Sequence, residues 1–309
     1  MNKGPRKVYC IGETVLDIIF RDNHPVSATP GGSMLNSAVS LGRTGLPVYF
    51  ISDYAKDHAG DLIHRFLVEN GVSAKFISRY PDGKTSLALA FLDAQQNADY
   101  SFYKIVPQER ITLSMPVTHA GDIILFGSFY ALTESVRKTI IAFITKAKTD
   151  GTTVIYDPNF RKAHLDELGI LRPRILENIS LADIVRGSDE DFSNIFNAYT
   201  PQDAFSHVNR AGCPLLVYTK SNKGIDVISS GYAKSYSVPA INPLSTIGAG
   251  DSFNAGIIYG MIQGNIRGTP GESSWDNIIG HATSFATDVC LSFENYISAE
   301  FGSSLSKLW

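Results

Sequence analysis

The sequence predicts a layered α/β fold built around a mainly parallel sheet. Short β-branched or aromatic runs alternate with amphipathic stretches of helical period. The 309 residues are 44% hydrophobic and only 18% charged. Such a chain has enough apolar surface to bury a core and too little charge to stay disordered.

The alternation places strands and helices in turn along the chain. Strands are expected at residues 8–11, 48–52, 123–126, 154–156, 184–185 and 215–218. Apolar residues recur every three or four positions in the expected covering helices, at 34–41, 61–69, 134–148, 174–179 and 252–262. We find no internal repeat and no low-complexity tract, so we expect residues 1–309 to form a single domain.

Two regions break this alternation and predict a small second sheet. Residues 15–30 and 84–105 contain extended segments, and the second region is nearly a hairpin of 87–92 and 100–103. No helical pattern is available to cover one face of these strands. Because exposed apolar sheet faces are usually sites of association, we expect a lid over a pocket, a dimer contact, or both.

Charge and cysteine content narrow the class of partner and the compartment. The 27 basic and 30 acidic residues leave a net charge of −3, and no Lys/Arg stripe indicates nucleic acid or an anionic membrane. Small-molecule partners are therefore expected. The three cysteines, Cys10, Cys213 and Cys290, are widely spaced and odd in number, which predicts reduced thiols and a cytoplasmic protein. The first apolar stretch is broken at Gly12 and Glu13, so we expect neither a signal peptide nor a membrane span.

The strongest local motif is Thr-Ile-Gly-Ala-Gly-Asp-Ser-Phe at residues 246–253, directly before a helical pattern. Gly248, Ala249 and Gly250 allow successive backbone N–H groups to point into one space, where the helix dipole adds positive potential. This pattern predicts an anion hole. Asp251 at the same helix start is suited to removing a proton from a hydroxyl group. The alternative is an ordinary capped helix with Asp in its first turn.

Two glycine-containing patterns resemble nucleotide-binding motifs but depart from them. Gly-Lys-Thr at 83–85 lacks the earlier glycine of a P-loop and precedes a strand, so we expect a turn there. The Gly-Ala-Gly segment carries Phe253 where a dinucleotide fingerprint has its third glycine, which disfavours NAD. The histidines show no spacing that would hold zinc.

A second motif, Gly-Gly-Ser-Met-Leu-Asn at residues 31–36, predicts close approach of a ligand to the backbone. Gly31 and Gly32 permit that approach, and Asn36 places an amide one turn into an apolar helix. Asp17 follows the first strand among apolar neighbours and is suited to accepting hydrogen bonds from sugar hydroxyls. The alternatives are a satisfied buried amide for Asn36 and a turn or cap carboxylate for Asp17.

Polar residues also follow the strand expected at 154–156. Asp157, Asn159 and Arg161 come at the carboxyl edge of the sheet, where open α/β folds bind ligands, and Arg161 is suited to a phosphate charge. The alternative is a surface loop. Ser188 followed by Asp191 is the weaker signal, because many helices begin in this way.

Together these residues resemble the ribokinase, or PfkB, family of carbohydrate kinases. The resemblance covers essentially the whole chain, since the glycine pair with Asn36 and the later Gly-Ala-Gly-Asp occur in the family's order. It implies a ribokinase-like three-layer sandwich with a mainly parallel central sheet and a small β-sheet lid from about 15–30 and 84–105. It also implies ATP-dependent phosphorylation of a sugar primary hydroxyl, Mg²⁺ that arrives with ATP, and a homodimer formed through the lid.

The resemblance assigns roles residue by residue. Asp251 becomes the catalytic base, and the catalytic group also includes Gly248, Ala249, Gly250 and Arg161. The implied substrate-binding residues are Asp17, Gly31, Gly32, Asn36, Tyr103 and Asn159. The implied nucleotide-binding residues are Ser188, Asp191, Thr219, Lys220, Gly224 and His281. No metal ligand is assigned.

The chain departs from the family pattern at several positions. Ser245 stands where the family has a cation-binding Asp, which leaves dependence on a monovalent cation open. The family's Asn-x-x-Glu motif is Ser188-x-x-Asp191, and Lys220 follows Thr219 where Leu is usual. The lid segment resembles fructokinase-like members, although Lys104 stands where those often have Arg. A 2-keto-3-deoxygluconate kinase, a ribokinase and a catalytically weak, kinase-like sugar-binding or regulatory protein are the alternatives.

Overall fold

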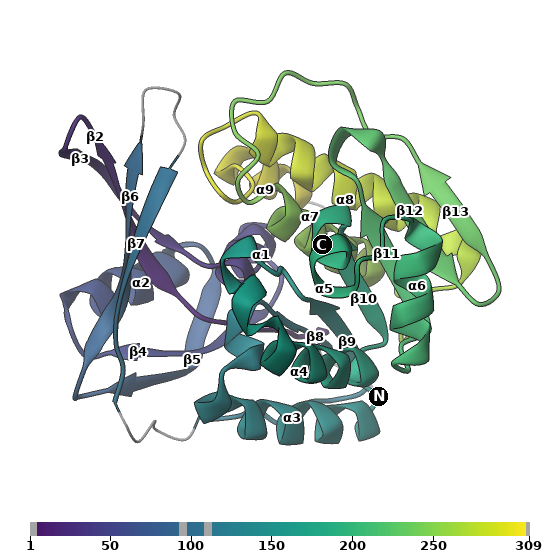
Figure 1. Ribbon diagram of the computed structural model, residues 1–309, viewed down its shortest axis with the longest axis horizontal. Coiled ribbons are helices and arrows are strands. Elements are labelled where there is room, and N and C mark those ends of the chain that lie inside the picture. Colours follow the sequence, from purple (N-terminus) through teal and green to yellow (C-terminus); the bar gives the residue numbers. More distant parts are fainter. Residues whose placement is uncertain (1–4, 93–97, 108–112, 307–309) are drawn as a thin grey trace.

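The computed structural model describes residues 5–92, 98–107 and 113–306, and its larger sheet has nine strands within them. These strands are β1 (Val8–Ile11), β4 (Val48–Ala55), β5 (Val72–Tyr80), β8 (Ile123–Gly127), β9 (Thr153–Asp157), β10 (Ile184–Ser188), β11 (Leu215–Thr219), β12 (Ile225–Ser229) and β13 (Ala233–Tyr236). Their order is β13-β12-β11-β10-β9-β8-β1-β4-β5 (Figure 1). Neighbours from β5 to β11 are parallel, and only β12 and β13 join antiparallel, so the predicted mainly parallel sheet is confirmed.

Helices cover both faces of this sheet. They are α1 (Ser33–Gly42), α2 (His58–Glu69), α3 (Glu134–Thr149), α4 (Leu168–Leu181), α5 (Asp189–Phe196), α6 (Pro201–Arg210), α7 (Ala249–Gln263), α8 (Trp275–Cys290) and α9 (Ala299–Ser306). Short 3₁₀ helices are η1 (Phe129–Leu132), η2 (Lys162–Glu167), η3 (Ser221–Lys223) and η4 (Glu272–Ser274).

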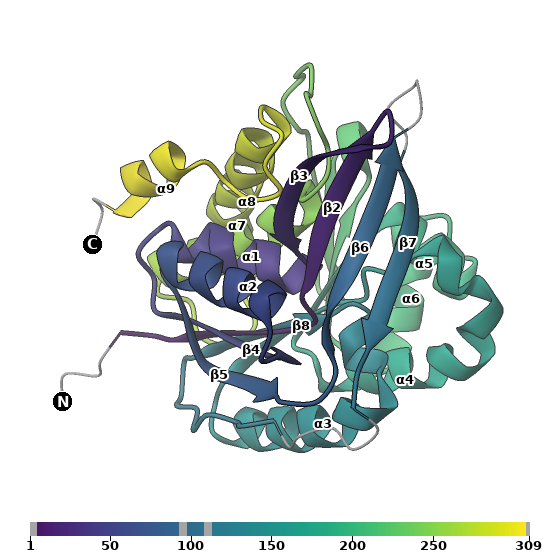
Figure 2. The same ribbon diagram turned by 90° about the vertical axis from the view of Figure 1, so that its left-hand side faces the viewer.

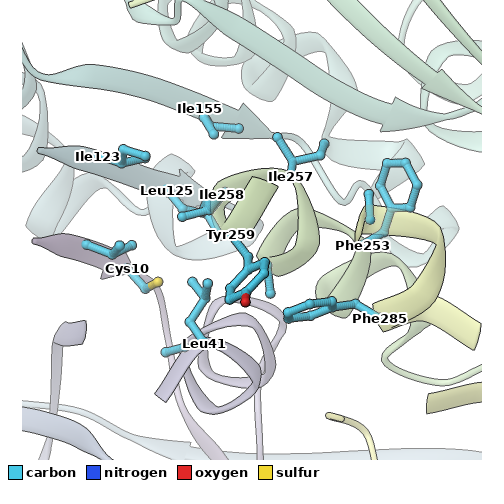
Figure 3. Close-up of a cluster of buried hydrophobic side chains, with 14 of the residues drawn as sticks. Cys10, Leu41, Ile123, Leu125, Ile155, Phe253, Ile257, Ile258, Tyr259 and Phe285 are labelled. Atoms are coloured by element: carbon cyan, nitrogen blue, oxygen red, sulfur yellow. The ribbon is translucent and has the colours of Figure 1, made fainter. Parts of the chain in front are cut away.

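The side chains of β1 show why the sheet needs two helical layers. Successive residues of a strand point to opposite faces. Val8 and Cys10 join a core with α1, α2, α7 and α8, part of which is drawn in Figure 3, whereas Tyr9 and Ile11 join a second core with α3 to α6. Because both faces are buried, the central strands are mostly apolar, and their polar residues lie mainly near the strand ends.

The smaller sheet is separate from this sandwich. Its strands are β2 (Val15–Arg21), β3 (His24–Gly31), β6 (Lys84–Leu92) and β7 (Ala98–Ile105), in the order β3-β2-β6-β7. The two antiparallel pairs, β2 with β3 and β6 with β7, are joined by parallel pairing of β2 with β6. Figure 2 shows the outward face of this sheet with no helix over it. The sheet comes from the two regions where the sequence predicted it.

Cys10 and Cys213 are buried, Cys290 is partly buried, and all three are unpaired. Within the residues that the structure describes, no helix has the length and apolar character that crossing a bilayer requires.

Helices α7 and α8 pack so closely that glycine is required where they cross, most strictly at Gly256. A Cβ on Gly256 would lie 2.4 Å from the Cα of Ala282, whereas a Cβ on Gly280, also in α8, would meet no heavy atom within 4 Å. We expect Gly256→Ala to lower the free energy of unfolding by about 1–3 kcal/mol, because the helices must separate.

The matched control is Gly280→Ala, which we expect to raise the free energy of unfolding by up to about 1 kcal/mol through helix propensity alone. Urea denaturation of both variants measures the difference. Equal effects of the two substitutions would contradict the close packing of α7 on α8.

Candidate active site

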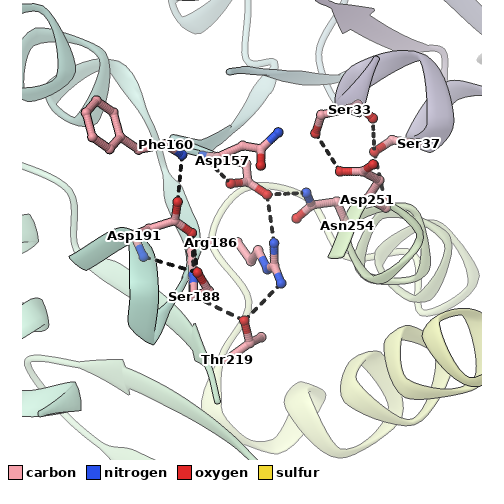
Figure 4. A network of polar contacts seen from close by, with 12 residues as sticks. Ser33, Ser37, Asp157, Phe160, Arg186, Ser188, Asp191, Thr219, Asp251 and Asn254 are labelled. Atoms are coloured by element: carbon pink, nitrogen blue, oxygen red, sulfur yellow. Dashed lines mark hydrogen bonds and ion pairs between the residues drawn. The ribbon is translucent and has the colours of Figure 1, made fainter. Parts of the chain in front are cut away.

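The carboxyl ends of the central parallel strands and the first turns of two helices meet at one edge of the large sheet. Figure 4 shows the polar side chains gathered there, from the ends of β9, β10 and β11 and from the starts of α1 and α7. Open parallel sheets bind ligands at this edge. Because the start of a helix carries unpaired N–H groups and the positive end of its dipole, this place favours an anion.

Asp251 lies in the first turn of α7 and is held by three side chains of α1. Ser33 Oγ donates to Asp251 Oδ1 over 2.5 Å, and Asn36 Nδ2 donates to Asp251 Oδ2 over 2.8 Å. Ser37 Oγ donates to the backbone carbonyl of Asp251 over 2.7 Å. The structure thus brings together Asp251 and Asn36, which the sequence singled out in separate motifs. It adds Ser33 and Ser37, which sequence reasoning missed because serine is common at helix starts.

Burial raises the pKa of the Asp251 carboxyl above its usual range. The negative charge of Asp157 acts in the same direction, whereas the hydrogen bonds from Ser33 and Asn36 and the positive charge of Arg161 lower this pKa. A carboxylate that binds a proton more readily than usual is suited to general-base chemistry.

The Gly-Ala-Gly turn before α7 lies where the sequence predicts an anion hole. Gly248 has φ 80°, and a Cβ on it would lie 2.1 Å from the carbonyl oxygen of Asn295, so only glycine fits. The amide of Ala249 already donates to a carbonyl within the turn over 3.3 Å. Among the described residues, the amides of Gly250 and Asp251 have no backbone acceptor. These two N–H groups remain available to an anion.

Asp17 lies on β2, next to the entry into α1. A Cβ on Gly31, the last residue of β3, would lie 2.0 Å from Asp17 Oδ2, so the carboxylate packs directly on the glycine backbone. Gly32 follows as the N-cap of α1, with φ 128°. Burial raises the pKa of Asp17 to about 6. The structure therefore places Asp17, Gly31 and Gly32 beside the helix start that carries Asn36.

A buried ion pair links the ends of three neighbouring strands. Arg186 Nη1 donates to Asp157 Oδ2 and Arg186 Nη2 donates to Thr219 Oγ1, both over 2.9 Å. Asn254 of α7 donates to the same Asp157 oxygen over 2.6 Å. Asp157 is 1% exposed and Arg186 is 8% exposed. Sequence reasoning did not identify Arg186 or Asn254. The available signal was an arginine directly after the apolar residues of a core strand.

Ser188 and Asp191 form the capping box of α5. Ser188 Oγ accepts from the Asp191 amide over 3.1 Å, and Asp191 Oδ2 accepts from the Ser188 amide over 2.7 Å. Asp191 Oδ1 also accepts from the Phe160 amide over 2.6 Å. Their polar atoms thus cap the start of α5 and bind the loop after β9, which is the ordinary helix start that this pair of residues also predicts. Burial raises the pKa of the Asp191 carboxyl.

The loop after β9 carries the two other residues expected near the substrate. Asn159 has φ 39°, and its amide donates to Asp157 Oδ1 over 2.9 Å. Arg161 is exposed, and its positive charge lowers the pKa of Asp251. The structure shows no hydrogen bond from either side chain to the Asp251 cluster among the described contacts.

The expected nucleotide edge lies along β11, β12 and α8. Lys220 Nζ pairs with Asp226 Oδ2 over 2.5 Å. Gly224, with φ 103°, makes the turn into β12. His281 contacts Tyr259 edge to face, with ring centroids 5.0 Å apart, and burial lowers the pKa of its imidazole. The structure does not join these residues to the Asp251 cluster by hydrogen bonds among the described contacts.

Tyr103 lies on the wrong face of the small sheet for the site of its own chain. Asp17 pairs with Ala88, and Ala88 pairs with Phe102, so these three side chains share one face. Tyr103 is the next residue along β7, points to the opposite face and is 56% exposed. This corrects the assignment of Tyr103 as a substrate-binding residue, which overlooked the alternation along the strand.

Among the residues with described positions, no group of three or more His, Cys, Asp or Glu side chains could hold a metal ion. Magnesium typically keeps several waters and binds through substrate phosphates with few protein ligands.

The chain is similar in sequence to known carbohydrate kinases. A family model described as "pfkB family carbohydrate kinase" matches residues 5–275. A fructokinase of Escherichia coli is 26% identical over 259 residues, which cover 82% of this chain and 84% of the relative. A fructokinase of Rhizobium leguminosarum bv. trifolii is 27% identical over 271 residues, covering 84% and 81%.

Solved structures share the fold. Fructokinase from Vibrio cholerae, with fructose, ADP and calcium bound, superposes with a TM-score of 0.82 at 22% identity, covering 94% of each chain. Aminoimidazole riboside kinase from Salmonella enterica, with aminoimidazole riboside and an ATP analogue, gives a TM-score of 0.81 at 18% identity, covering 98% of each chain. These likenesses confirm the predicted three-layer α/β sandwich with a smaller sheet.

The partly buried Asp17 carboxylate predicts a measurable dependence of stability on pH. Its pKa of about 6 in the folded chain lies above the value near 4 of an unfolded aspartate. Ionisation therefore costs stability as the pH rises through this interval. We expect Asp17→Asn to be more stable than the parent at pH 7.5, by up to about 3 kcal/mol, and to lose most of this advantage at pH 4.5.

Urea denaturation at the two pH values measures this effect. Asp166→Asn, which changes an exposed aspartate of η2, is the control and should leave stability nearly unchanged at both pH values. An advantage of Asp17→Asn that is the same at both pH values would contradict the burial of this carboxylate.

Proposed function

Since the chain belongs to the pfkB family of carbohydrate kinases, it transfers a phosphoryl group from ATP to a sugar, and we propose that Asp251 is its catalytic base. The observation that carries this proposal is the position of the carboxylate, in the first turn of α7 beside the unpaired amides of Gly250 and Asp251. A phosphoryl group held by these amides lies next to a group that accepts a proton.

The reaction follows from this arrangement. Asp251 takes the proton of the sugar hydroxyl as its oxygen attacks the γ-phosphorus. A new O–P bond forms, the bond from that phosphorus to the β-phosphate oxygen breaks, and ADP leaves. Each carboxylate oxygen has two lone pairs, so Asp251 can keep its bonds from Ser33 and Asn36 and still accept from the substrate.

We propose that the sugar lies between the inner face of the small sheet and the start of α1. Asp17, with its carboxylate against Gly31, is placed to accept hydrogen bonds from sugar hydroxyls. Asn159 and Arg161 line the opposite rim, where Arg161 is suited to the charge of the transferred phosphate. The part of the nucleotide beyond the phosphates is assigned to the edge formed by Thr219, Lys220, Gly224 and His281.

A fructose-like ketose that reacts at a primary hydroxyl is the proposed acceptor. The E. coli and Rhizobium relatives are named fructokinases, and the V. cholerae structure contains fructose. The lid of this chain carries Lys104, whose Nζ pairs with Glu13 over 3.1 Å. Lysine lacks the planar guanidinium with which arginine donates two parallel hydrogen bonds, so this contact differs from the one that an arginine at the same position of the lid would make.

We propose Mg²⁺ as the metal that accompanies ATP. The free amides of the α7 turn fit the phosphates, and the absence of a cluster of three metal-binding side chains among the described residues fits an ion held by phosphate oxygens and water. When bound, the ion neutralises phosphate charge. Ser245 offers a hydroxyl, which accepts from the Ile247 amide over 3.2 Å, and supplies no carboxylate for a monovalent cation.

The outward face of the small sheet is proposed as the contact of a homodimer. Phe20 and Phe91 stack there with ring centroids 4.8 Å apart, and Tyr103 and Ile105 share this face and are 56% and 62% exposed. A second copy of the same face would bury these side chains. The unpaired cysteines support a reducing compartment, the cytoplasm, as the proposed location.

Asp251→Asn tests the assignment of the base. We expect sugar binding and unfolding temperature to stay close to those of the parent, because the amide keeps the size of the side chain. We expect kcat to fall by about 10²–10⁴-fold, because the amide does not accept the proton. A coupled assay of ADP release with fructose, ribose, 2-keto-3-deoxygluconate and aminoimidazole riboside measures turnover.

The same panel tests the acceptor. Fructose should give the highest kcat/KM of the four. If Asp251→Asn keeps its turnover, another group is the base. If the parent binds a sugar without releasing ADP in any assay, the protein is a sugar-binding relative of the kinases.

Analytical ultracentrifugation tests the dimer. We expect the parent to sediment as a dimer at micromolar concentration, and Phe91→Glu as a monomer, because a charge on the proposed interface opposes burial. The control is Ile170→Glu, at an exposed position of α4 away from the small sheet, which should leave the dimer intact. A monomeric parent would overturn the proposed interface.

A further inference from the structure

Arg186 is a buried cation at the centre of the site. It is 8% exposed and lies on β10, between Asp157 at the end of β9 and Thr219 at the end of β11. Its two terminal nitrogens each donate over 2.9 Å to one of these side chains. Two hydrogen bonds to different side chains, one from each nitrogen, fix the plane of the guanidinium.

The same guanidinium packs against the turn that presents the free amides. A Cβ on Gly250 would lie 2.9 Å from Arg186 Nη1 and 3.2 Å from Nη2, so the backbone of Gly250 rests directly on the charged group. The guanidinium carbon also lies 5.5 Å from the ring centroid of Phe253 in the same helix. Arg186 therefore packs directly against the first turn of α7. Asn254, in the same helix, is linked to Arg186 through its hydrogen bond to Asp157.

The charges around the site make this cation necessary. Three carboxylates, Asp157, Asp191 and Asp251, come together there, and Arg186 and Arg161 are the cations that act on them. The charge of Asp157 raises the pKa of both other carboxyls, and Arg186 lowers that of Asp191. Without Arg186, the buried Asp157 would repel both the ionised Asp251 and an incoming phosphate.

We propose that Arg186 is a positioning residue for phosphoryl transfer, which cancels the charge of Asp157 and holds the α7 turn, so that Asp251 stays ionised and the amides stay attractive to phosphate. This inference rests on the proposed role of Asp251 as the base. It assigns to Arg186 a charge-balancing role through Asp157, and not a contact with the sugar.

The test compares variants that change the charge of the pair in opposite directions. Arg186→Gln leaves Asp157 unneutralised, so we expect the acidic limb of the kcat profile to move upward by about one pH unit and kcat to fall by about 10²-fold. Asp157→Asn leaves Arg186 in excess, so the limb should move downward. The double variant removes both charges and should return the limb to near its parent position.

Arg186→Lys separates charge from geometry. It keeps the cation and loses the two-pronged contact, so the limb should stay in place while kcat falls by up to about 10-fold. The pH profile distinguishes the proposal from a purely structural role, because loss of structure lowers kcat equally at every pH. Thermal unfolding of each variant reports on folding, and Asp157→Asn with Arg186→Lys suffices if Arg186→Gln does not fold.

Two results would overturn the inference. One is an acidic limb that stays at the same pH in both single-charge variants, and the other is a double variant whose limb remains displaced. Asp251→Asn in the same assay separates this failure from that of the proposed function. If Asp251→Asn is inactive while the limb does not move, only the role of Arg186 is wrong. If Asp251→Asn is active, the base itself is wrong.

Discussion

The contact between the starts of α1 and α7 is the constraint on which the site depends. These helices lie more than 200 residues apart in the chain, yet Ser33 and Asn36 bind the carboxylate of Asp251 and Ser37 binds its backbone. One turn further in, Ser40 Oγ and Ser252 Oγ are 2.9 Å apart and continue the contact. Because both helices pack on the same face of the large sheet, their positive ends face one place, and the polar groups there have their positions fixed by the core.

The site costs the fold stability, which the rest of the molecule must supply. Burial raises the pKa of the Asp17, Asp191 and Asp251 carboxyls, so ionising each of them in the folded chain costs free energy. Two continuous apolar cores, one on each face of the sheet, offset this cost. Such a division, with a strained polar edge on a well-packed sandwich, is common in enzymes.

The sequence predicted the central strands and the helices α1, α2, α3, α4 and α7 because their apolar periodicity is strong, whereas α6 and α9 were not among the expected elements. It missed β5, which mixes Lys75 and Arg79 with apolar residues at the sheet edge, and β12 and β13, which follow β11 without a helix between them. Glycine-rich turns and the Asp251 motif were visible locally. The ion pair between Arg186 and Asp157 could not be predicted, because it depends on which strands are neighbours in the sheet. Tyr103 was assigned to the wrong face, because a shift of one residue along a strand moves a side chain to the opposite face.

Only Gly32 separates the end of β3 at Gly31 from the first residue of α1 at Ser33. The strand that borders the proposed sugar space and the helix whose side chains bind Asp251 are therefore almost continuous in the chain. Ser33, the donor to Asp251 Oδ1, stands two residues beyond the end of β3, so a change in the position of this strand would act directly on that hydrogen bond.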